Sequence, residues 1–156
     1  IPNMATANAD IWLNGENVEQ PIREISVAAR VSEIAAIAEV REFAVGCQRS
    51  MRHDSGIVMD GRDVGTVVFP DAELKIFMTA DMEVRVARRY KEMLQKHENV
   101  SLQEVRENIA QRDYTDTHRI ISPLRQADDA IVIDNTDLTP EQQLAYALKL
   151  VRAITG

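Results

Sequence analysis

The stretch GIVMDGRDVGTVVFPDAELKIF, residues 56–77, contains two short apolar runs separated by a charged pair, Arg62 and Asp63. Short runs rich in branched residues and bounded by Gly, Asp or Asn are typical of buried strands, because they are too short to be buried helices. We therefore predict buried strands at residues 56–60 and 74–79, with a polar turn after the first.

Further patterns along the chain predict the α/β class. A third apolar run, AIVID at residues 130–134, predicts another buried strand. Helical spacing of apolar residues predicts helices at 81–97 and 101–119, and a closing helix after Thr139. The last two begin with capping boxes, Ser-x-x-Glu and Thr-Pro-x-Gln. Strands that alternate with helices imply a parallel sheet with right-handed crossovers.

The first third of the chain has different patterns. Residues 11–18, IWLNGENV, alternate apolar and polar side chains around Asn14-Gly15 and predict a β-hairpin. Residues 24–51 have apolar side chains at helical spacing and predict two helices with a break near residue 39.

Composition excludes several classes of protein. The chain has 156 residues, of which 45% are hydrophobic, which suits one globular domain. Its formal net charge of −7 argues against non-specific binding to nucleic acid or anionic membranes. One cysteine permits no internal disulfide, and the three histidines have no spacing suited to a metal. No apolar stretch approaches the roughly 20 residues that span a bilayer.

The polar turn at residues 60–65 lies where a ligand site is expected. In open α/β sheets, ligands bind beyond the carboxyl ends of the strands. Gly61 and Gly65 permit unusual φ angles or the close approach of a ligand. Arg62 offers a planar donor fork to a phosphate, and Asp63 can accept from an amino or hydroxyl group. The alternative is a strand-ending turn with an exposed ion pair. The turn is not a phosphate-binding loop of the Gly-x-x-x-x-Gly-Lys-Ser/Thr type.

Two helical segments bring arginines together. Arg85, Arg88 and Arg89 share one helical sector, which predicts either an anion site or a solvated face. Residues 112, 116 and 119 are Arg, Asp and Arg at i, i+4 and i+7, and they present two cations around a carboxylate if the helix continues that far. Such a face could close over a phosphoryl group.

Ser32 and Arg41 lie in an otherwise apolar helical region. A hydroxyl and a guanidinium cost free energy there unless they meet a partner or face solvent. Both alternatives stay open from the residues alone.

Taken together, five segments at matching spacing resemble the bacterial cytidylate kinases, a family of nucleoside monophosphate kinases. The most specific pieces are Asp60-Gly-Arg-Asp63-x-Gly65 with the following Phe69-Pro70, and Arg112-Asp113 through Ser122-Pro123-Leu124. The resemblance runs from about residue 11 to the end of the chain. The segments that carry it are IREISVAARVSEIAAIAEVRE, MDGRDVGTVVFPDAELKIFMTA, VRVARRYKE, QRDYTDTHRIISPLRQADDAIVIDNT and the closing helix.

The resemblance implies a three-layer core like that of P-loop kinases, of which this chain has three of the five parallel strands. It divides the chain into the remainder of a monophosphate-binding insert, residues 1–55, and the core, residues 56–156. Within the core, a helical lid is expected at about residues 88–124.

The resemblance also implies transfer of the terminal phosphoryl group of ATP to CMP or dCMP, with Mg²⁺. It assigns the substrate-binding role to Ser32, Arg41, Arg62, Asp63, Arg112, Asp116 and Arg119. It assigns the catalytic role to Arg112, Arg119 and Arg89. Ser32, Arg41 and Asp63 are expected around the cytosine base, and Arg62 on the monophosphate.

One departure from the family concerns the phosphoryl donor. The family's phosphate-binding loop precedes the region where this chain begins, so the residues that hold ATP and Mg²⁺ are expected outside it. We therefore expect these 156 residues to be inactive alone, as a proteolytic or truncated piece of a cytoplasmic, monomeric enzyme that could self-associate as a fragment. The alternative is a non-catalytic nucleotide-binding or assembly module that keeps only the CMP pocket.

Overall fold

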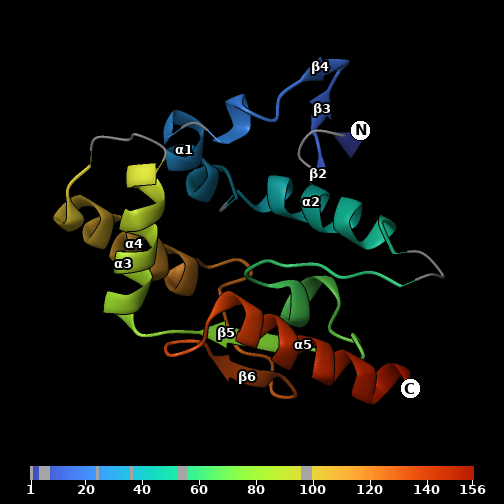
Figure 1. Cartoon of the computed structure of the whole chain (residues 1–156). Coiled ribbons are helices and arrows are strands. Elements are labelled where there is room, and N and C mark those ends of the chain that lie inside the picture. Colours follow the sequence, from blue (N-terminus) through green and yellow to red (C-terminus); the bar gives the residue numbers. More distant parts are fainter. Residues whose placement is uncertain (1, 4–7, 24, 36, 53–55, 96–99) are drawn as a thin grey trace. The chain divides into compact units, whose positions relative to one another are not determined.

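The computed structural model describes residues 2–3, 8–23, 25–35, 37–52, 56–95 and 100–156 (Figure 1). The chain divides into two compact units. The first unit is Ile1–Arg41 and the second is Glu42–Gly156. Among the described residues, no helix is long and apolar enough to cross a membrane.

The first unit consists of two short antiparallel ribbons and a helix. In the first ribbon β1 (Pro2–Asn3) pairs with β2 (Asn8–Ala9), and in the second β3 (Trp12–Leu13) pairs with β4 (Glu16–Asn17). The predicted hairpin is confirmed: Asn14 and Gly15 have φ angles of 51° and 86°, as a two-residue turn with both central φ angles positive requires. A 3₁₀ turn, η1 (Pro21–Arg23), leads into helix α1 (Ile25–Ala35).

Helix α1 ends at Ala35 and helix α2 (Ala38–Ser50) begins at Ala38, close to the predicted break near residue 39. Its second part belongs to the second unit, where Val45 is buried. Val45 forms a small core with the buried Val68 and Phe69. Val68 ends η2 (Val64–Val68), a single π-helical turn.

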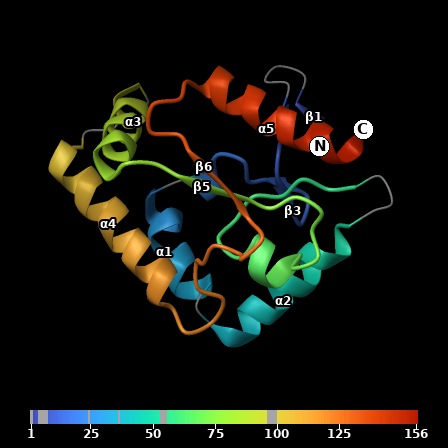
Figure 2. The same ribbon diagram turned by 90° about the horizontal axis from the view of Figure 1, so that it is seen from below.

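The second unit contains a two-stranded parallel sheet. Strand β5 (Ile76–Thr79) pairs with β6 (Ile131–Asp134) from Ile76↔Ile131 to Thr79↔Asp134. The crossover between them contains α3 (Met82–Gln95) and α4 (Leu102–His118). These two helices run side by side in both ribbon views (Figures 1 and 2), and α5 (Pro140–Thr155) follows β6.

Both predicted capping boxes are present. The hydroxyl of Ser101 accepts from the Glu104 amide while the Glu104 carboxylate accepts from the Ser101 amide, and Thr139 and Gln142 do the same at α5. The hydrogen bonds from Ser101 hold the pKa of Glu104 below its ordinary value. Each box satisfies amide groups that have no partner within the helix, so it fixes where the helix begins.

The prediction of a buried strand at residues 56–60 is wrong. These residues, all within the described part of the chain, form no strand, and Val58 is 99% exposed. A strand exists only by pairing with a neighbour, and no described segment pairs with this one. The third predicted strand is correctly placed, but Ile131 and Val132 are exposed and only its Ile133 is buried. The fold is thus α/β with a small parallel sheet.

Candidate functional site

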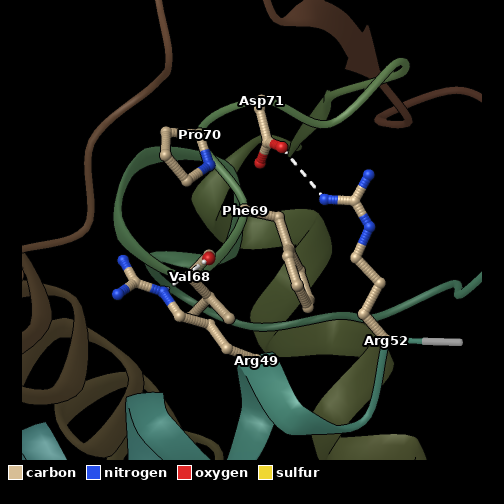
Figure 3. Close-up of a pocket in the computed structure, with 6 residues that line it drawn as sticks. All are labelled: Arg49, Arg52, Val68, Phe69, Pro70 and Asp71. Carbon is tan, nitrogen blue, oxygen red and sulfur yellow. Dashed lines mark hydrogen bonds and ion pairs between the residues drawn. The ribbon is translucent and has the colours of Figure 1, made fainter.

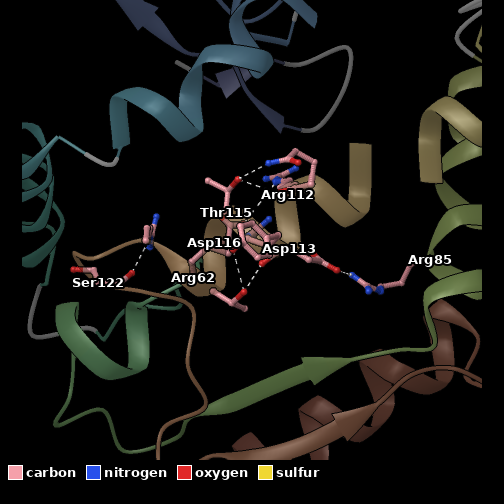
Figure 4. A network of polar contacts seen from close by, with 11 residues as sticks. Arg62, Arg85, Arg112, Asp113, Thr115, Asp116 and Ser122 are labelled. Carbon is pink, nitrogen blue, oxygen red and sulfur yellow. Dashed lines mark hydrogen bonds and ion pairs between the residues drawn. The ribbon is translucent and has the colours of Figure 1, made fainter. Parts of the chain in front are cut away.

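A buried carboxylate at the end of α4 lies at the centre of the candidate site. The Asp116 side chain is 8% exposed, and its Oδ2 accepts a hydrogen bond from Arg62 Nε at 2.8 Å. Arg112 Nε lies 3.9 Å from the same oxygen. We call Arg62, Arg112 and Asp116 the Asp116 cluster (Figure 4).

The three residues of the Asp116 cluster come together for local and tertiary reasons. Arg112 and Asp116 are one turn apart on α4, where side chains four residues apart are neighbours. Beyond the helix the chain folds back, and the Leu124 amide donates to the Asp116 carbonyl oxygen at 2.7 Å. Arg62 reaches the cluster from the turn before η2, 54 residues away in sequence.

The charges of the Asp116 cluster favour the binding of an anion. Two guanidinium groups face one carboxylate, which leaves a net positive charge. Arg62 and Arg112 side chains are 41% and 60% exposed, so both remain accessible from solvent. A guanidinium presents five N–H donors in a planar fork, which matches the oxygens of a phosphate.

Asp63, next to Arg62, is 4% exposed and immediately precedes η2. Its carbonyl oxygen accepts from the amides of Thr66, Val67 and Val68, at 3.3, 2.8 and 3.2 Å. These backbone hydrogen bonds stabilise the conformation of the turn that begins at Asp63.

The predicted reason for the two glycines of this turn is partly wrong. Neither Gly61 nor Gly65 has a positive φ angle. What each glycine provides is space: a Cβ at Gly61 would lie 2.8 Å from Val64 Cγ2, and one at Gly65 would lie 3.4 Å from Lys75 Cδ. The ammonium group of Lys75 in turn binds the Pro70 carbonyl and the Asp129 carboxylate.

Substitution of the two glycines is expected to have different effects. Gly61→Ala creates a clash with Val64, and we expect it to lower the free energy of unfolding by about 1–3 kcal/mol, the usual cost of overpacking. Gly65→Ala adds a methyl group at an ordinary contact distance from a flexible side chain, so we expect a change below about 1 kcal/mol. Urea denaturation of both variants measures the difference. Equal costs would contradict the close approach of Gly61 to Val64.

Arg119 lies just beyond α4, which ends at His118, so the predicted single helical face of residues 112, 116 and 119 is wrong. The residue caps the helix in an extended conformation, and its Nε donates to the Ser122 carbonyl at 2.7 Å. Its Nη2 is buried without a hydrogen-bond partner among the described residues. A buried donor without an acceptor is costly, which makes Arg119 a candidate to receive an oxygen of a ligand.

Each arginine of the α3 sector has polar partners among the described residues. Arg85 pairs with Asp113 of α4 at 2.7 Å, and Arg88 donates to backbone carbonyls after β6, including that of Asn135 at 2.7 Å. Arg89 pairs with Glu92 on its own helix at 2.9 Å. Arg106 also bonds Glu83 across the two helices. These contacts link α3 to α4 and α3 to the end of β6, and they place Arg89 outside the Asp116 cluster.

Ser32 and Arg41 belong to the first unit. The backbone of Ser32 lies within α1, and its side chain lies outside the described residues. Arg41 is half-buried in the first turn of α2. The structure therefore gives no geometry between them and the Asp116 cluster.

One arginine near the site is not distinguished by the sequence patterns. Arg49, on the last turn of α2, donates to the carbonyls of Val68 and Val67. It lines a pocket of about 310 Å³ together with Arg52 and Asp71 (Figure 3). Arg52 pairs with Asp71 at 2.9 Å and so lowers the pKa of that carboxyl. Arg49 lies one helical turn after the buried Val45 on α2, and a polar residue at that spacing is the sequence signal that could have identified it.

The sequence of this chain matches one family of known proteins. The family described as cytidylate kinase matches residues 2–153. A cytidylate kinase of Bacteroides thetaiotaomicron is 54% identical over 142 residues, which cover 91% of this chain and 62% of the relative. One of Flavobacterium johnsoniae is 55% identical over 94% of this chain and 64% of its own length. One of Parabacteroides distasonis is 52% identical over 99% and 67%. The chain thus spans about two thirds of the length of these relatives.

Proposed function

The chain belongs to the cytidylate kinase family, and from this premise we propose that its protein transfers the terminal phosphoryl group of ATP to CMP or dCMP, giving CDP or dCDP. The observation that supports this most directly is the Asp116 cluster, where Arg62 and Arg112 meet at one buried carboxylate. Phosphoryl transfer requires mainly positioning and neutralisation of charge, and arginines held by a fixed carboxylate supply both.

Each residue of the site has a proposed role. Arg62 binds the monophosphate of the acceptor nucleotide, while Asp116 holds Arg62 in place and contacts the sugar side. Arg112 and Arg119 stabilise the negative charge of the transferring group. The unbonded Nη2 of Arg119 supports its role, since a phosphoryl oxygen would give this donor an acceptor.

Asp63 is proposed to select the base. Cytosine carries an exocyclic amino group that donates to a carboxylate, whereas uracil carries a carbonyl oxygen there. A buried carboxylate that faced this oxygen would lose its hydrogen bond, and hydrogen-bonding sites reject close analogues in this way. Ser32 and Arg41 are proposed to contact the same base on the basis of the family resemblance. Arg89 is proposed as a cation of the lid.

The finer architecture is also a proposal. We propose that β5 and β6 belong to a larger, three-layer parallel core in the complete protein, with residues 1–55 in the monophosphate-binding insert and a lid at about 88–124. No Gly-x-x-x-x-Gly-Lys-Ser/Thr pattern occurs in the 156 residues. The groups that hold ATP and Mg²⁺ are thus proposed to lie in the part of the relatives' length that this chain does not span. We expect a cytoplasmic monomer.

An assay of the complete protein tests the proposal. With Mg-ATP and CMP or dCMP, we expect the protein to form ADP and CDP or dCDP in equal amounts, and to react much more slowly with UMP. The products are measured by ³¹P NMR. The 156-residue chain alone should show no turnover. Absence of CDP from the complete protein, under conditions where it binds ATP, would refute the function. Rapid turnover by the short chain would refute the assignment of the donor site.

A further inference from the structure

We propose that Arg49 is the positioning residue of the turn that carries Arg62 and Asp63, an inference that rests on the proposed role of that turn in binding CMP. Arg49 lies at the end of α2, and its guanidinium bonds two successive backbone carbonyls. Nε donates to Val68 O at 3.1 Å and Nη2 donates to Val67 O at 2.7 Å (Figure 3 shows the first contact).

The two carbonyls are at the far end of η2 from Asp63. The Asp63 carbonyl accepts from three amides of η2, and the Phe69 amide donates to Val64 O at 2.7 Å. Residues 63–69 are therefore wound into one tight turn. The last carbonyls of any helical turn have no partner within it, and a cation there complements the dipole of the peptide groups. Arg49 supplies both the donors and the charge.

Apolar packing acts at the same place. Val45 is one turn before Arg49 on α2, and it forms a core cluster with Val68 and Phe69, which are 1% and 7% exposed. Helix α2 thus holds the end of η2 by packing and by two charge-assisted hydrogen bonds. Because the turn between is tightly bonded, a shift at Val68 is passed to Asp63 at its other end. A displacement of about 1 Å at a reacting group can reduce the rate about 100-fold.

Arginine is specifically suited to this role. Its planar fork matches two adjacent carbonyl oxygens, whereas the ammonium of lysine is a single point of charge. Arg52 offers a matched control, because it lines the same pocket but binds the exposed carboxylate of Asp71. Among the described residues, no hydrogen bond joins Arg52 to the carbonyls of η2.

The test compares Arg49→Met, Arg49→Lys and Arg52→Met in the complete protein. For Arg49→Met we expect a ratio of kcat/KM for CMP over UMP that is lower by about tenfold or more, with a raised KM for CMP and an unchanged KM for ATP. Arg49→Lys should be intermediate, and Arg52→Met should match the unsubstituted protein. Hydrogen exchange of the amides of residues 66–69 should be faster in Arg49→Met only.

The outcomes separate this inference from the proposed function. Faster exchange with an unchanged CMP-to-UMP ratio and KM would show that Arg49 only stabilises the fold, and it would overturn the inference. Equal effects of the Arg49 and Arg52 substitutions would overturn it as well. If the unsubstituted protein does not phosphorylate CMP, the proposed function fails and this inference fails with it, whereas phosphorylation of CMP with an unchanged ratio in Arg49→Met overturns the inference alone.

Discussion

Replacement of Asp116 by Asn in the complete protein is expected to lower kcat/KM for CMP about 10- to 100-fold. The substitution keeps the size of the side chain but removes the charge that holds Arg62 at 2.8 Å. Hydrogen bonds to charged groups contribute about 1.5–3 kcal/mol, and each 1.36 kcal/mol corresponds to about tenfold in rate. Because the Arg62 side chain is 41% exposed, solvent screening favours the lower part of this range. Steady-state kinetics with CMP measures the loss.

Asp113→Asn is the matched control for this prediction. Asp113 is on the same helix and also pairs with an arginine, Arg85, but both side chains are substantially exposed and neither belongs to the Asp116 cluster. Such pairs contribute little, so we expect less than about a threefold change.

A double-mutant cycle tests the coupling directly. If Asp116 acts by holding Arg62, the double variant Asp116→Asn, Arg62→Met should lose less transition-state stabilisation, calculated as a free energy from kcat/KM, than the sum of the losses in the two single variants. Strict additivity would contradict that relation. A loss for Asp113→Asn as large as that for Asp116→Asn would show that any acid on α4 matters equally.

Local features of the fold could be predicted from the sequence because their causes lie within a few residues. The Asn14-Gly15 turn requires two positive φ angles, and asparagine and glycine tolerate them best. The capping boxes at Ser101 and Thr139 depend on residues three positions apart. Each of these predictions is confirmed.

Strands depend on distant partners, and there the sequence was less informative. Residues 56–60 and 130–134 have the same apolar character, but β6 pairs with β5 while residues 56–60 find no described neighbour. Pairing contributes the hydrogen bonds that define a strand, and composition does not reveal it.

The site shows the same division. The proximity of Arg112 and Asp116 follows from helical spacing, whereas the pairing of Arg62 with Asp116 joins residues 54 positions apart. Two arginines of α3 have partners on other elements, such as Asp113 for Arg85, and helical spacing alone does not predict such pairs. Arg49 belongs to no recognisable sequence motif. Its partners are backbone carbonyl groups, which every residue has, so the sequence does not reveal the contact.

Substitution of Asp63 is expected to have the largest effect on specificity. Asp63→Ala in the complete protein should remove the preference for cytosine, with a fall of about 100-fold or more in the ratio of kcat/KM for CMP over UMP. Asp63→Asn should lower the ratio further by improving UMP, because an amide can donate to the uracil carbonyl where a carboxylate cannot. Competition assays with both nucleotides give this ratio independently of the fraction of folded enzyme.

Asp71→Asn provides the control, since this carboxylate follows the same turn but is exposed and pairs with Arg52. It should leave the ratio unchanged. Asp63 is 4% exposed, so its substitution also affects stability, and thermal unfolding of each variant separates that effect from selectivity. If both Asp63 variants remained folded and kept their preference for CMP, the buried carboxylate would be a structural group, and selection of the base would have to come from other residues of the protein.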